Sequence, residues 1–395
     1  MHIESDVVVV GGGMIGLSIS KALVNLNYKV AIIEKNTPPL VWDQSEVADR
    51  VSAINRRTQV FLQSIGVWDN IIANIGSGCA YTNMDICTNH TKETLHLSSH
   101  EVGETELGFI IENRLVIREV WNSLKSSNTS IHISDISDIS GNPGNWKINL
   151  SSREIIRCKL IVGCDGANSM IRKYFNFNLF EKSYGHYAMI ATVKVDNANQ
   201  DTAYQKFSDT NIIAFLPTNK KSIFSMVWSM NEYDFERNMN LTNLDFDREL
   251  NAVIMDRLGK CQVLSERKGY PLIERHVKQY SKHGVVLVGD SAHTFHPLAG
   301  QGVNVGFNDV IKFIKTISKL RDRGRLVWHE SSLREYEREV RLYNSTVIIL
   351  IKSLKQLFST KKNSVIRARG FGVKIFNKFT IIKGIIIKLA MGKIK

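Results

Sequence analysis

The fold is decided by one stretch near the start of the chain, Val7-Val8-Val9-Val10-Gly11-Gly12-Gly13-Met14-Ile15-Gly16. Residues 6–10 are predicted to form a parallel strand buried on both faces, and residues 14–26 carry apolar side chains at helical spacing. The glycines match G-x-G-x-x-G: Gly11 permits a tight turn, Gly13 lets a pyrophosphate approach the backbone, and Gly16 lets helix and strand pack closely. Together these features predict a dinucleotide site, with a purely structural glycine turn as the alternative.

An acidic residue closes the second predicted strand, which spans residues 28–33. Glu34 lies eighteen residues past Gly16, where a carboxylate can accept hydrogen bonds from the ribose of an adenosine. A carboxylate at this place would repel a 2′-phosphate. The bound dinucleotide is therefore expected to be FAD or NAD.

Two later apolar runs also end in turns of glycine and polar residues. Residues 160–162 lead into Gly163-Cys164-Asp165-Gly166, and residues 285–288 lead into Gly289-Asp290. Strands that end in this way predict an open α/β sheet with a ligand crevice at one edge. Between them, short extended segments separated by polar turns predict an inserted, mainly antiparallel substrate domain; they cover residues 188–195, 203–207, 212–216 and 222–228.

The turn after residues 285–288 favours FAD over NAD. Asp290, next to Gly289 at a strand end, can hold the ribityl hydroxyls of a flavin. The following run, Gly300-Gln301-Gly302-Val303-Asn304, opens a helix and aims free N–H groups at one point. Such a point suits the anionic N1–C2=O edge of a reduced flavin. NAD would leave this second site without a purpose, and a strand-turn-helix with glycines for packing is the alternative.

Three segments together resemble the signatures of the group A flavoprotein monooxygenases, the family of 4-hydroxybenzoate hydroxylase. They are Gly11 to Gly16, Asp165-Gly166-Ala167-Asn168-Ser169 with Arg172, and Gly289-Asp290. Within this family the chain is similar to the ubiquinone-biosynthesis hydroxylases from about residue 5 to about residue 345. The segments that carry this similarity are Arg50-Val51-Ser52-Ala53-Ile54-Asn55, Gly66-Val67-Trp68, Ile111-Glu112-Asn113, Ala214-Phe215-Leu216-Pro217 and residues 289–306. Val227-Trp228-Ser229 and Arg257-Leu258-Gly259 are most similar to the bacterial 2-polyprenylphenol 6-hydroxylases.

The resemblance implies a Rossmann-like FAD-binding domain of the 4-hydroxybenzoate hydroxylase type and roles for particular residues. Asp165, Gly166 and Arg172 would lie near the FAD pyrophosphate and help NAD(P)H to dock transiently, and Arg50 would contact FAD. A compatible structural interpretation has Asp165 capping a helix and pairing with Arg172, and a surface ion pair is the alternative for Arg50. The expected domain limits are 1–73, 97–176 and 276–360 for FAD binding, 74–96 and 177–275 for substrate, and 361–395 for a basic, apolar C-terminal tail.

The same resemblance implies an aromatic hydroxylase. NAD(P)H would reduce the flavin, O2 would add at its C4a atom, and the flavin hydroperoxide would hydroxylate a polyprenylated phenol. The cofactor carries this chemistry, so no protein catalytic constellation is required. The candidates beside the flavin are His293, Pro297, Gly300, Gln301 and Gly302, and the candidates beside the substrate are Phe215, Leu216 and Pro217. A flavin oxidoreductase that inserts no oxygen, and an FAD-binding scaffold without catalysis, are the alternatives.

The distribution of charge indicates a surface partner. The net charge is +13, yet residues 340–395 hold thirteen Lys or Arg and no Asp or Glu, so residues 1–339 are formally neutral. A basic tail interleaved with Ile and Phe predicts contact with an anionic membrane from the cytoplasmic side rather than with nucleic acid; a solvated terminal helix is the alternative. No signal-peptide pattern opens the chain, which predicts a cytoplasmic protein, and the five cysteines show no metal-ligand spacing. The sequence leaves open whether the chain joins a quinone-biosynthesis protein complex and whether it forms a homo-oligomer.

Overall fold

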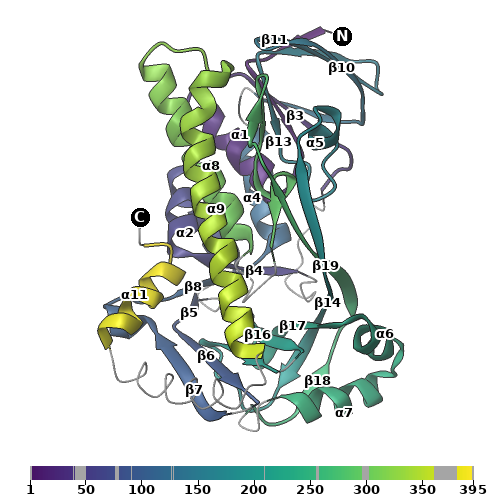
Figure 1. Ribbon diagram of the computed structural model, residues 1–395, viewed down its shortest axis with the longest axis vertical. Coiled ribbons are helices and arrows are strands. Elements are labelled where there is room, and N and C mark those ends of the chain that lie inside the picture. Colours follow the sequence, from purple (N-terminus) through teal and green to yellow (C-terminus); the bar gives the residue numbers. More distant parts are fainter. Residues whose placement is uncertain are drawn as a thin grey trace.

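A six-stranded sheet forms the upper half of the molecule (Figure 1). The computed structural model describes residues 2–38, 40, 50–75, 80–89, 91–125, 127, 129–208, 210–254, 258–295, 302–359 and 380–393. In spatial order the strands of this sheet are β20 (Ser281–Lys282), β21 (Val285–Leu287), β13 (Leu160–Gly163), β2 (Val7–Val10), β3 (Val30–Glu34) and β9 (Thr129–Ile133). All but β20 run parallel, and every residue of β2 is buried, as the β-branched run predicts. The Rossmann-like α/β fold is confirmed.

Helices and a smaller sheet flank this parallel sheet. Helix α1 contacts both α4 and α8, and α8 in turn contacts the long helix α9 (Figure 1). The helices are α1 (Met14–Asn25), α2 (Arg56–Ser64), α3 (Trp68–Ile75), α4 (Asn113–Lys125), α5 (Met170–Tyr174), α8 (Gly302–Asp322) and α9 (Glu330–Ser359). The smaller sheet has the order β1 (His2–Glu4), β12 (Ile155–Cys158), β11 (Asn145–Leu150) and β10 (Ile136–Asn142).

A nine-stranded, mainly antiparallel sheet occupies the lower half of Figure 1. Its order is β22 (His293–Thr294), β19 (Lys268–Val277), β14 (Leu179–Val195), β17 (Ile223–Asn231), β16 (Ile212–Pro217), β15 (Thr202–Phe207), β6 (Asn83–Thr88) and β7 (Thr91–Ser98), with β18 (Cys261–Val263) beside β14. Helices α6 (Glu232–Asn240) and α7 (Asn243–Val253) pack on its strands. The antiparallel sheet predicted from the short extended segments is therefore present.

Strand β14 is longer than predicted. The sequence pattern indicated a strand over residues 188–195 only, whereas β14 begins at Leu179 and its first half pairs with β19. Most side chains between Leu179 and Tyr187 are exposed or half-buried, so that half carries no apolar pattern. The pairing of backbone groups with β19, rather than side-chain burial, explains this half of the strand.

Residues 380–393 return to the body of the protein. A three-stranded sheet, β4 (Val51–Asn55), β8 (Gly108–Glu112) and β5 (Ala80–Tyr81), lies between the two large sheets in Figure 1, near the 3₁₀ helix η2 (Ser99–Val102). Helix α11 (Thr380–Ala390) packs against η2 and β7. The described part of the predicted tail is thus a docked helix. Among the described residues, no helix combines the length and the apolar character that crossing a membrane requires.

Candidate functional site

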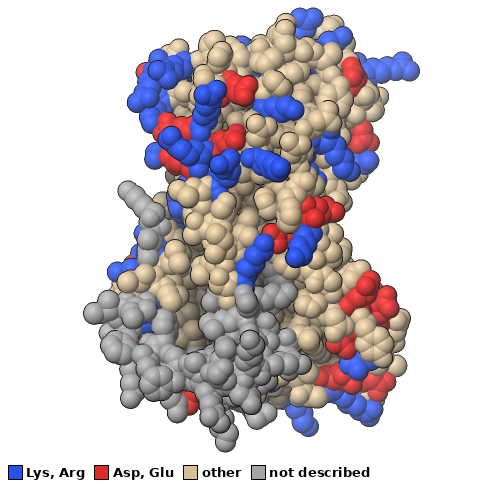
Figure 2. Space-filling view, in the orientation of Figure 1, with Lys and Arg blue, Asp and Glu red and all other residues tan. Residues whose placement is uncertain are grey.

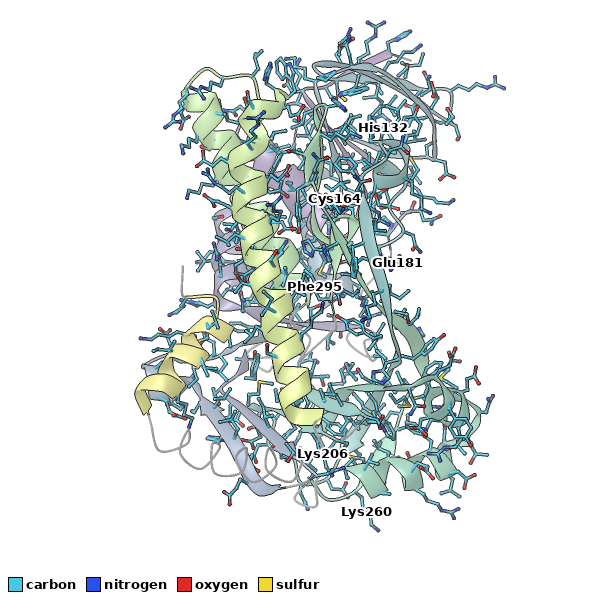
Figure 3. All side chains as sticks on the ribbon, viewed as in Figure 1. His132, Cys164, Glu181, Lys206, Lys260 and Phe295 are labelled. Atoms are coloured by element: carbon cyan, nitrogen blue, oxygen red, sulfur yellow. The ribbon has the colours of Figure 1, made fainter. Side chains whose placement is uncertain are left out.

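The three predicted turns meet at one edge of the parallel sheet. Val10 of β2 lies opposite Gly163 of β13, and Gly163 lies opposite Leu287 of β21. The N–H of Cys164 donates to the carbonyl of Val10 at 2.7 Å, and the N–H of Val288 donates to the carbonyl of Gly163 at 3.0 Å. Figure 3 labels Cys164 at this edge and Phe295 below it. The carboxyl ends of the strands form the shared floor of the candidate site.

Glycine is needed for a different reason at each of the three positions of the first motif. Gly11 has φ +112°, and a Cβ atom there would lie 2.3 Å from the carbonyl oxygen of Cys164. A Cβ on Gly16 would lie 1.9 Å from the carbonyl oxygen of Gly11. A Cβ on Gly13 would meet no protein atom within 4 Å. The fold itself therefore requires Gly11 and Gly16, while Gly13 leaves open space before the N-terminus of α1, as a bound pyrophosphate needs.

Glu34 lies beside this turn. Its Oε2 accepts a hydrogen bond from the N–H of Gly12, and its Oε1 accepts from the N–H of Asn36 at 3.2 Å. An ionised carboxylate has about four lone-pair sites, so acceptor capacity remains for the hydroxyls of a ribose. The geometry fits the predicted role of Glu34, which stays a prediction.

Asp165 and Arg172 connect the middle segment to its neighbours. Asp165 Oδ2 accepts from the N–H groups of Met170, at 2.7 Å, and Ile171, at 3.0 Å, so the predicted helix capping of α5 is confirmed. The predicted pairing of Arg172 with Asp165 is wrong: the guanidinium donates to the carbonyls of Ala167, at 2.7 Å, and Ser291, at 2.8 Å. These bonds fasten the middle segment to the turn after β21.

Asp165 and Gly166 also provide features that fit a cofactor. Asp165 Oδ1 is buried and has no hydrogen-bond partner among the described residues, which leaves a carboxylate oxygen without a donor. Gly166 has φ +78°, and a Cβ there would meet no atom within 4 Å. Buried polar atoms are normally paired, so an unpaired oxygen beside open space is the kind of position at which a ligand group donates.

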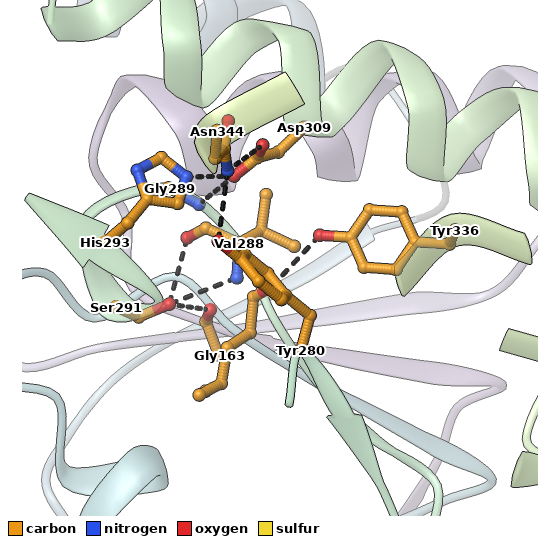
Figure 4. A network of polar contacts seen from close by, with 10 residues as sticks. Gly163, Tyr280, Val288, Gly289, Ser291, His293, Asp309, Tyr336 and Asn344 are labelled. Carbon is orange, nitrogen blue, oxygen red and sulfur yellow. Dashed lines mark hydrogen bonds and ion pairs between the residues drawn. The ribbon is translucent and has the colours of Figure 1, made fainter. Parts of the chain in front are cut away.

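Asp309 of α8 is the centre of a buried polar network (Figure 4). Its side chain is fully buried, and its Oδ2 accepts from the N–H of Gly289 at 3.1 Å and from His293 Nε2 at 2.5 Å. Its Oδ1 accepts from Asn344 Nδ2 at 3.2 Å, and that amide nitrogen also donates to the hydroxyl of Tyr280 at 3.2 Å. Burial raises the pKa of Tyr280, so its hydroxyl stays neutral. Asp309 therefore joins the turn after β21 to α8 and α9.

His293, predicted as a candidate beside the flavin, is an internal member of this network. Its side chain is 2% exposed, and its ring stacks on Phe295 with ring centroids 4.8 Å apart. The structure assigns Nε2 to the hydrogen bond with Asp309. The histidine thus holds the start of the segment that leads from β22 towards α8.

Ser291 fastens the same turn to the sheet. Its hydroxyl donates to the carbonyl of Gly163 at 2.6 Å and accepts from the N–H of Val288 at 3.1 Å. Gly289, between them, has φ +67°, which favours glycine. The Ser291 hydroxyl thus makes a bond between the turn after β21 and β13 that an alanine side chain could not make.

Asp290 and Arg50 form the accessible part of the site. The Asp290 side chain can be reached by solvent, yet enclosure by the surrounding protein raises the pKa of its carboxyl, while the charges of His293 and Arg50 oppose that rise. Arg50 is exposed, and its guanidinium carbon lies 5.7 Å from the centre of the Tyr270 ring. No ion pair joins Arg50 to another described residue, so the surface ion-pair alternative gains no support. A contact with FAD stays a prediction.

The first turn of α8 begins at Gly302, where a Cβ would meet no atom within 4 Å. The side chain of Asn304 turns away from this open space: its Oδ1 accepts from the N–H of Asn55 at 3.0 Å, and its Nδ2 donates to the carbonyl of Ala53 at 2.7 Å. Asn304 can therefore offer a cofactor its backbone but not its side-chain amide. Val303, which is half-buried, precedes it in the same turn. Pro297, Gly300 and Gln301 lie outside the described residues.

The three predicted substrate residues do not share one face. Phe215 packs with Met226 and Trp228 in a cluster that also includes residues of α7, whereas Leu216 packs in a separate cluster with Ala53 and Tyr81. Successive side chains of a strand point to opposite faces, so Phe215 and Leu216 cannot line one pocket. Pro217 is buried at the end of β16. Of Phe215 and Leu216, only Leu216 packs with a residue of β4, the strand that is hydrogen-bonded to Asn304.

One described pocket lies elsewhere. It has a volume of about 670 Å³, lies between β20 and α9, and is lined by Arg334, Arg338 and Arg341 together with Glu330 and Glu337, among others. Figure 2 shows basic and acidic side chains mixed over the upper part of this face. None of the predicted site residues lines this pocket, so it is separate from the turns that meet at the sheet edge.

Sequence reasoning missed the roles of Asp309, Asn344 and Tyr280. Asp309 had one signal, a polar residue among apolar ones in the predicted helix after Gly302. Asn344 and Tyr280 had none, because they reach the network from α9 and from the segment before β20. Only the folded chain brings them together.

Comparison with known proteins agrees with an FAD site at the edge of the parallel sheet. A family model described as an FAD binding domain matches residues 4–347. The 3-demethoxyubiquinol 3-hydroxylase of Escherichia coli (strain K12) is 30% identical over 347 residues, which cover 84% of each chain. The mitochondrial ubiquinone biosynthesis monooxygenase of Xenopus tropicalis is 26% identical over 444 residues, which cover 98% of this chain and 93% of the relative.

Two solved structures show the same fold. The p-nitrophenol 4-monooxygenase from Pseudomonas putida DLL-E4 has a TM-score of 0.77 at 16% identity and covers 99% of this chain and 98% of its own. HpxO of Klebsiella pneumoniae, in complex with FAD, has a TM-score of 0.73 at 15% identity and covers 99% of both chains. The chain therefore belongs to the FAD-dependent monooxygenases of the ubiquinone hydroxylase family.

Proposed function

We propose that this chain hydroxylates the aromatic ring of a polyprenylated phenol on the route to ubiquinone. The observation that carries the proposal is the meeting of the apolar cluster around Leu216 with Ala53, whose carbonyl binds Asn304 in the first turn of α8. This apolar cluster thus reaches the helix start that is expected to bind the flavin ring. The names of the relatives, a 3-demethoxyubiquinol 3-hydroxylase and a ubiquinone biosynthesis monooxygenase, support the substrate class.

The ring position is part of the same proposal. The similarity of Val227-Trp228-Ser229 and Arg257-Leu258-Gly259 to the bacterial 2-polyprenylphenol 6-hydroxylases supports attack at position 6. Trp228 is buried in β17 and packs with Phe215 on the sheet face that is away from β4. It would therefore shape the sheet that carries the substrate rather than touch the substrate.

The residues that would hold FAD follow from the site. FAD, when bound, supplies the oxygen activation, with NAD(P)H as transient reductant and O2 as co-substrate. The N-terminus of α1, open at Gly13, would hold the pyrophosphate, and Glu34 would hold the ribose. Asp290 would bind the ribityl hydroxyls, and the α8 N-terminus at Gly302 would stabilise negative charge on the ring. Arg50 would contact the cofactor from the accessible side.

The experiment that tests the function is reduction of the FAD-loaded protein without oxygen, followed by exposure to O2 with and without a short-chain prenylphenol. We expect a hydroxylated product that appears together with flavin reoxidation and depends on the phenol. Reoxidation that yields only H2O2 with every phenol supplied would contradict the proposal and favour a flavin oxidoreductase that inserts no oxygen. No reoxidation at all would favour a non-catalytic scaffold.

We further propose that the outer face of α11 contacts an anionic membrane on the cytoplasmic side. Ile385, Ile386 and Leu389 are 53%, 41% and 45% exposed, and Lys388 lies among them. Exposed aliphatic side chains beside a basic residue fit an anionic lipid surface. Residues 380–393 belong to the segment 340–395, which contains no acidic residue.

Vesicle cosedimentation tests this contact. Ile385→Asp with Leu389→Asp should weaken binding to vesicles that contain phosphatidylglycerol by about tenfold, because two apolar contacts are replaced by charges that the membrane repels. Tyr233→Asp is the control, since Tyr233 is 76% exposed on the distant helix α6. Equal binding by the double variant and the unaltered protein would exclude α11 as the membrane contact. Size-exclusion chromatography of the double variant and of the unaltered protein would show whether the exposed face of α11 instead holds two copies of the chain together.

A further inference from the structure

The C-terminal helix closes the apolar cluster that contains Leu216. Ile387 is fully buried and Met391 is 1% exposed, and both pack in the cluster with Leu216 and Ala53. Tyr81, Leu97 and other residues of the three-stranded sheet and of β7 complete this cluster. Figure 1 shows α11 across the end of β5, β7 and β8. The inner face of α11 thus covers this apolar cluster, in which Leu216 meets Ala53 of β4.

Two ion pairs fasten α11 to the segment that follows β7. Lys383 Nζ lies 2.7 Å from Glu101 Oε1, and the lysine side chain is only 6% exposed. Lys393 pairs with Glu104 just beyond the helix. A lysine is rarely buried without a partner, and removing one member of such a pair leaves an uncompensated charge. The pairs therefore define how α11 sits on the cluster.

Met391 and Gly392 also lie against the end of β4 and the start of α2. Gly392 has φ +71°, and a Cβ there would lie 2.9 Å from Arg57 Cβ and 3.1 Å from the side-chain nitrogen of Asn55. The N–H of Asn55 donates to Asn304 Oδ1 in the first turn of α8. Met391 and Gly392 thus contact residues that are one hydrogen bond from the predicted flavin-binding turn.

We propose that α11 is a seal that keeps water away from the bound flavin ring and the substrate, an inference that rests on the proposed function. Coupled turnover converts NAD(P)H, a proton, O2 and the phenol into NAD(P)+, water and the hydroxylated phenol. Uncoupled turnover converts NAD(P)H, a proton and O2 into NAD(P)+ and H2O2. Exclusion of water favours the coupled outcome. Ile387 and Met391 supply the apolar closure, and Lys383 with Glu101 holds it in place.

The test compares two inner variants with two outer ones on the same helix. Ile387→Ala and Lys383→Glu act on the buried face, whereas Ile385→Ala and Lys388→Glu act on exposed side chains. All four are assayed without vesicles, so that the proposed membrane contact of the outer face plays no part. We expect the fraction of NAD(P)H converted to H2O2 to rise about threefold in the inner variants and to stay unchanged in the outer ones. The exchange Lys383→Glu with Glu101→Lys should restore coupling, because it rebuilds the pair with the charges reversed.

A second measurement needs no turnover. Quenching of the bound flavin's fluorescence by iodide and by acrylamide reports solvent access, and it should increase about twofold in the inner variants at equal FAD content. Unchanged quenching and coupling in both inner variants would overturn the seal. If the unaltered protein hydroxylates no phenol while quenching still rises in the inner variants, the proposed function fails and the seal stands. Loss of FAD from the inner variants alone would show that α11 holds the cofactor site together, and would also overturn the seal.

Discussion

The Gly13→Ala variant should keep its fold but no longer copurify with one FAD per chain. The Cβ of the new alanine meets no protein atom within 4 Å, and the backbone at Gly13, with φ −76° and ψ −179°, is extended and open to any residue. The added methyl group would occupy the space before the N-terminus of α1 where the pyrophosphate must approach the backbone. We expect the dissociation constant of FAD, measured by titrating the FAD-free protein, to rise at least about tenfold, which corresponds to roughly 1.4 kcal/mol of binding free energy. The FAD content after purification, read from the ratio of flavin to protein absorbance, should fall accordingly.

Gly16→Ala separates a binding defect from a folding defect. The new Cβ would lie 1.9 Å from the carbonyl oxygen of Gly11, so this variant should lower the melting temperature of the FAD-free protein. Gly13→Ala should leave that melting temperature unchanged. If Gly13→Ala and the bulkier Gly13→Val both retained one FAD per chain, the pyrophosphate site would not lie at α1.

The strand ends and their turns could be predicted because they depend on local sequence. A strand buried on both faces must be apolar throughout, as β2 is, and a tight turn with positive φ favours glycine, as at Gly11 and Gly289. Parallel strands present their carboxyl ends at one edge, so three such turns had to converge. These local features therefore predict a cofactor-binding fold without any information on the packing.

The rest of the site depends on contacts between distant segments, which leave no local pattern. Asn344 reaches Asp309 from another helix, and Lys383 pairs with Glu101 across most of the chain. Phe215 and Leu216 are adjacent and both apolar, so composition could not show that they face different clusters. The pairing predicted for Arg172 was wrong because two backbone carbonyls, invisible in a sequence, bind its guanidinium instead.

Asp309→Asn should destabilise the protein and weaken its hold on FAD. The carboxylate faces three donors, the N–H of Gly289, Nε2 of His293 and Nδ2 of Asn344. Asparagine has one acceptor oxygen and one NH2 group, so at least one of these contacts becomes donor against donor in a fully buried place. Hydrogen bonds to charged groups contribute about 1.5–3 kcal/mol each, and we expect the free energy of unfolding in urea to fall by about 2–3 kcal/mol.

Tyr336→Phe is the matched control for this network. Tyr336 is as buried as Asp309, and its hydroxyl donates to the carbonyl of Leu287 at 3.0 Å, so the variant removes one neutral hydrogen bond from the same strand end. It should cost about 1 kcal/mol of unfolding free energy and leave FAD affinity unchanged. Asp309→Asn should weaken FAD binding in addition, because Gly289 and His293 both lose the group that ties their turn to α8. Equal FAD affinity in the two variants would mean that Asp309 supports the core alone and does not position the cofactor turn.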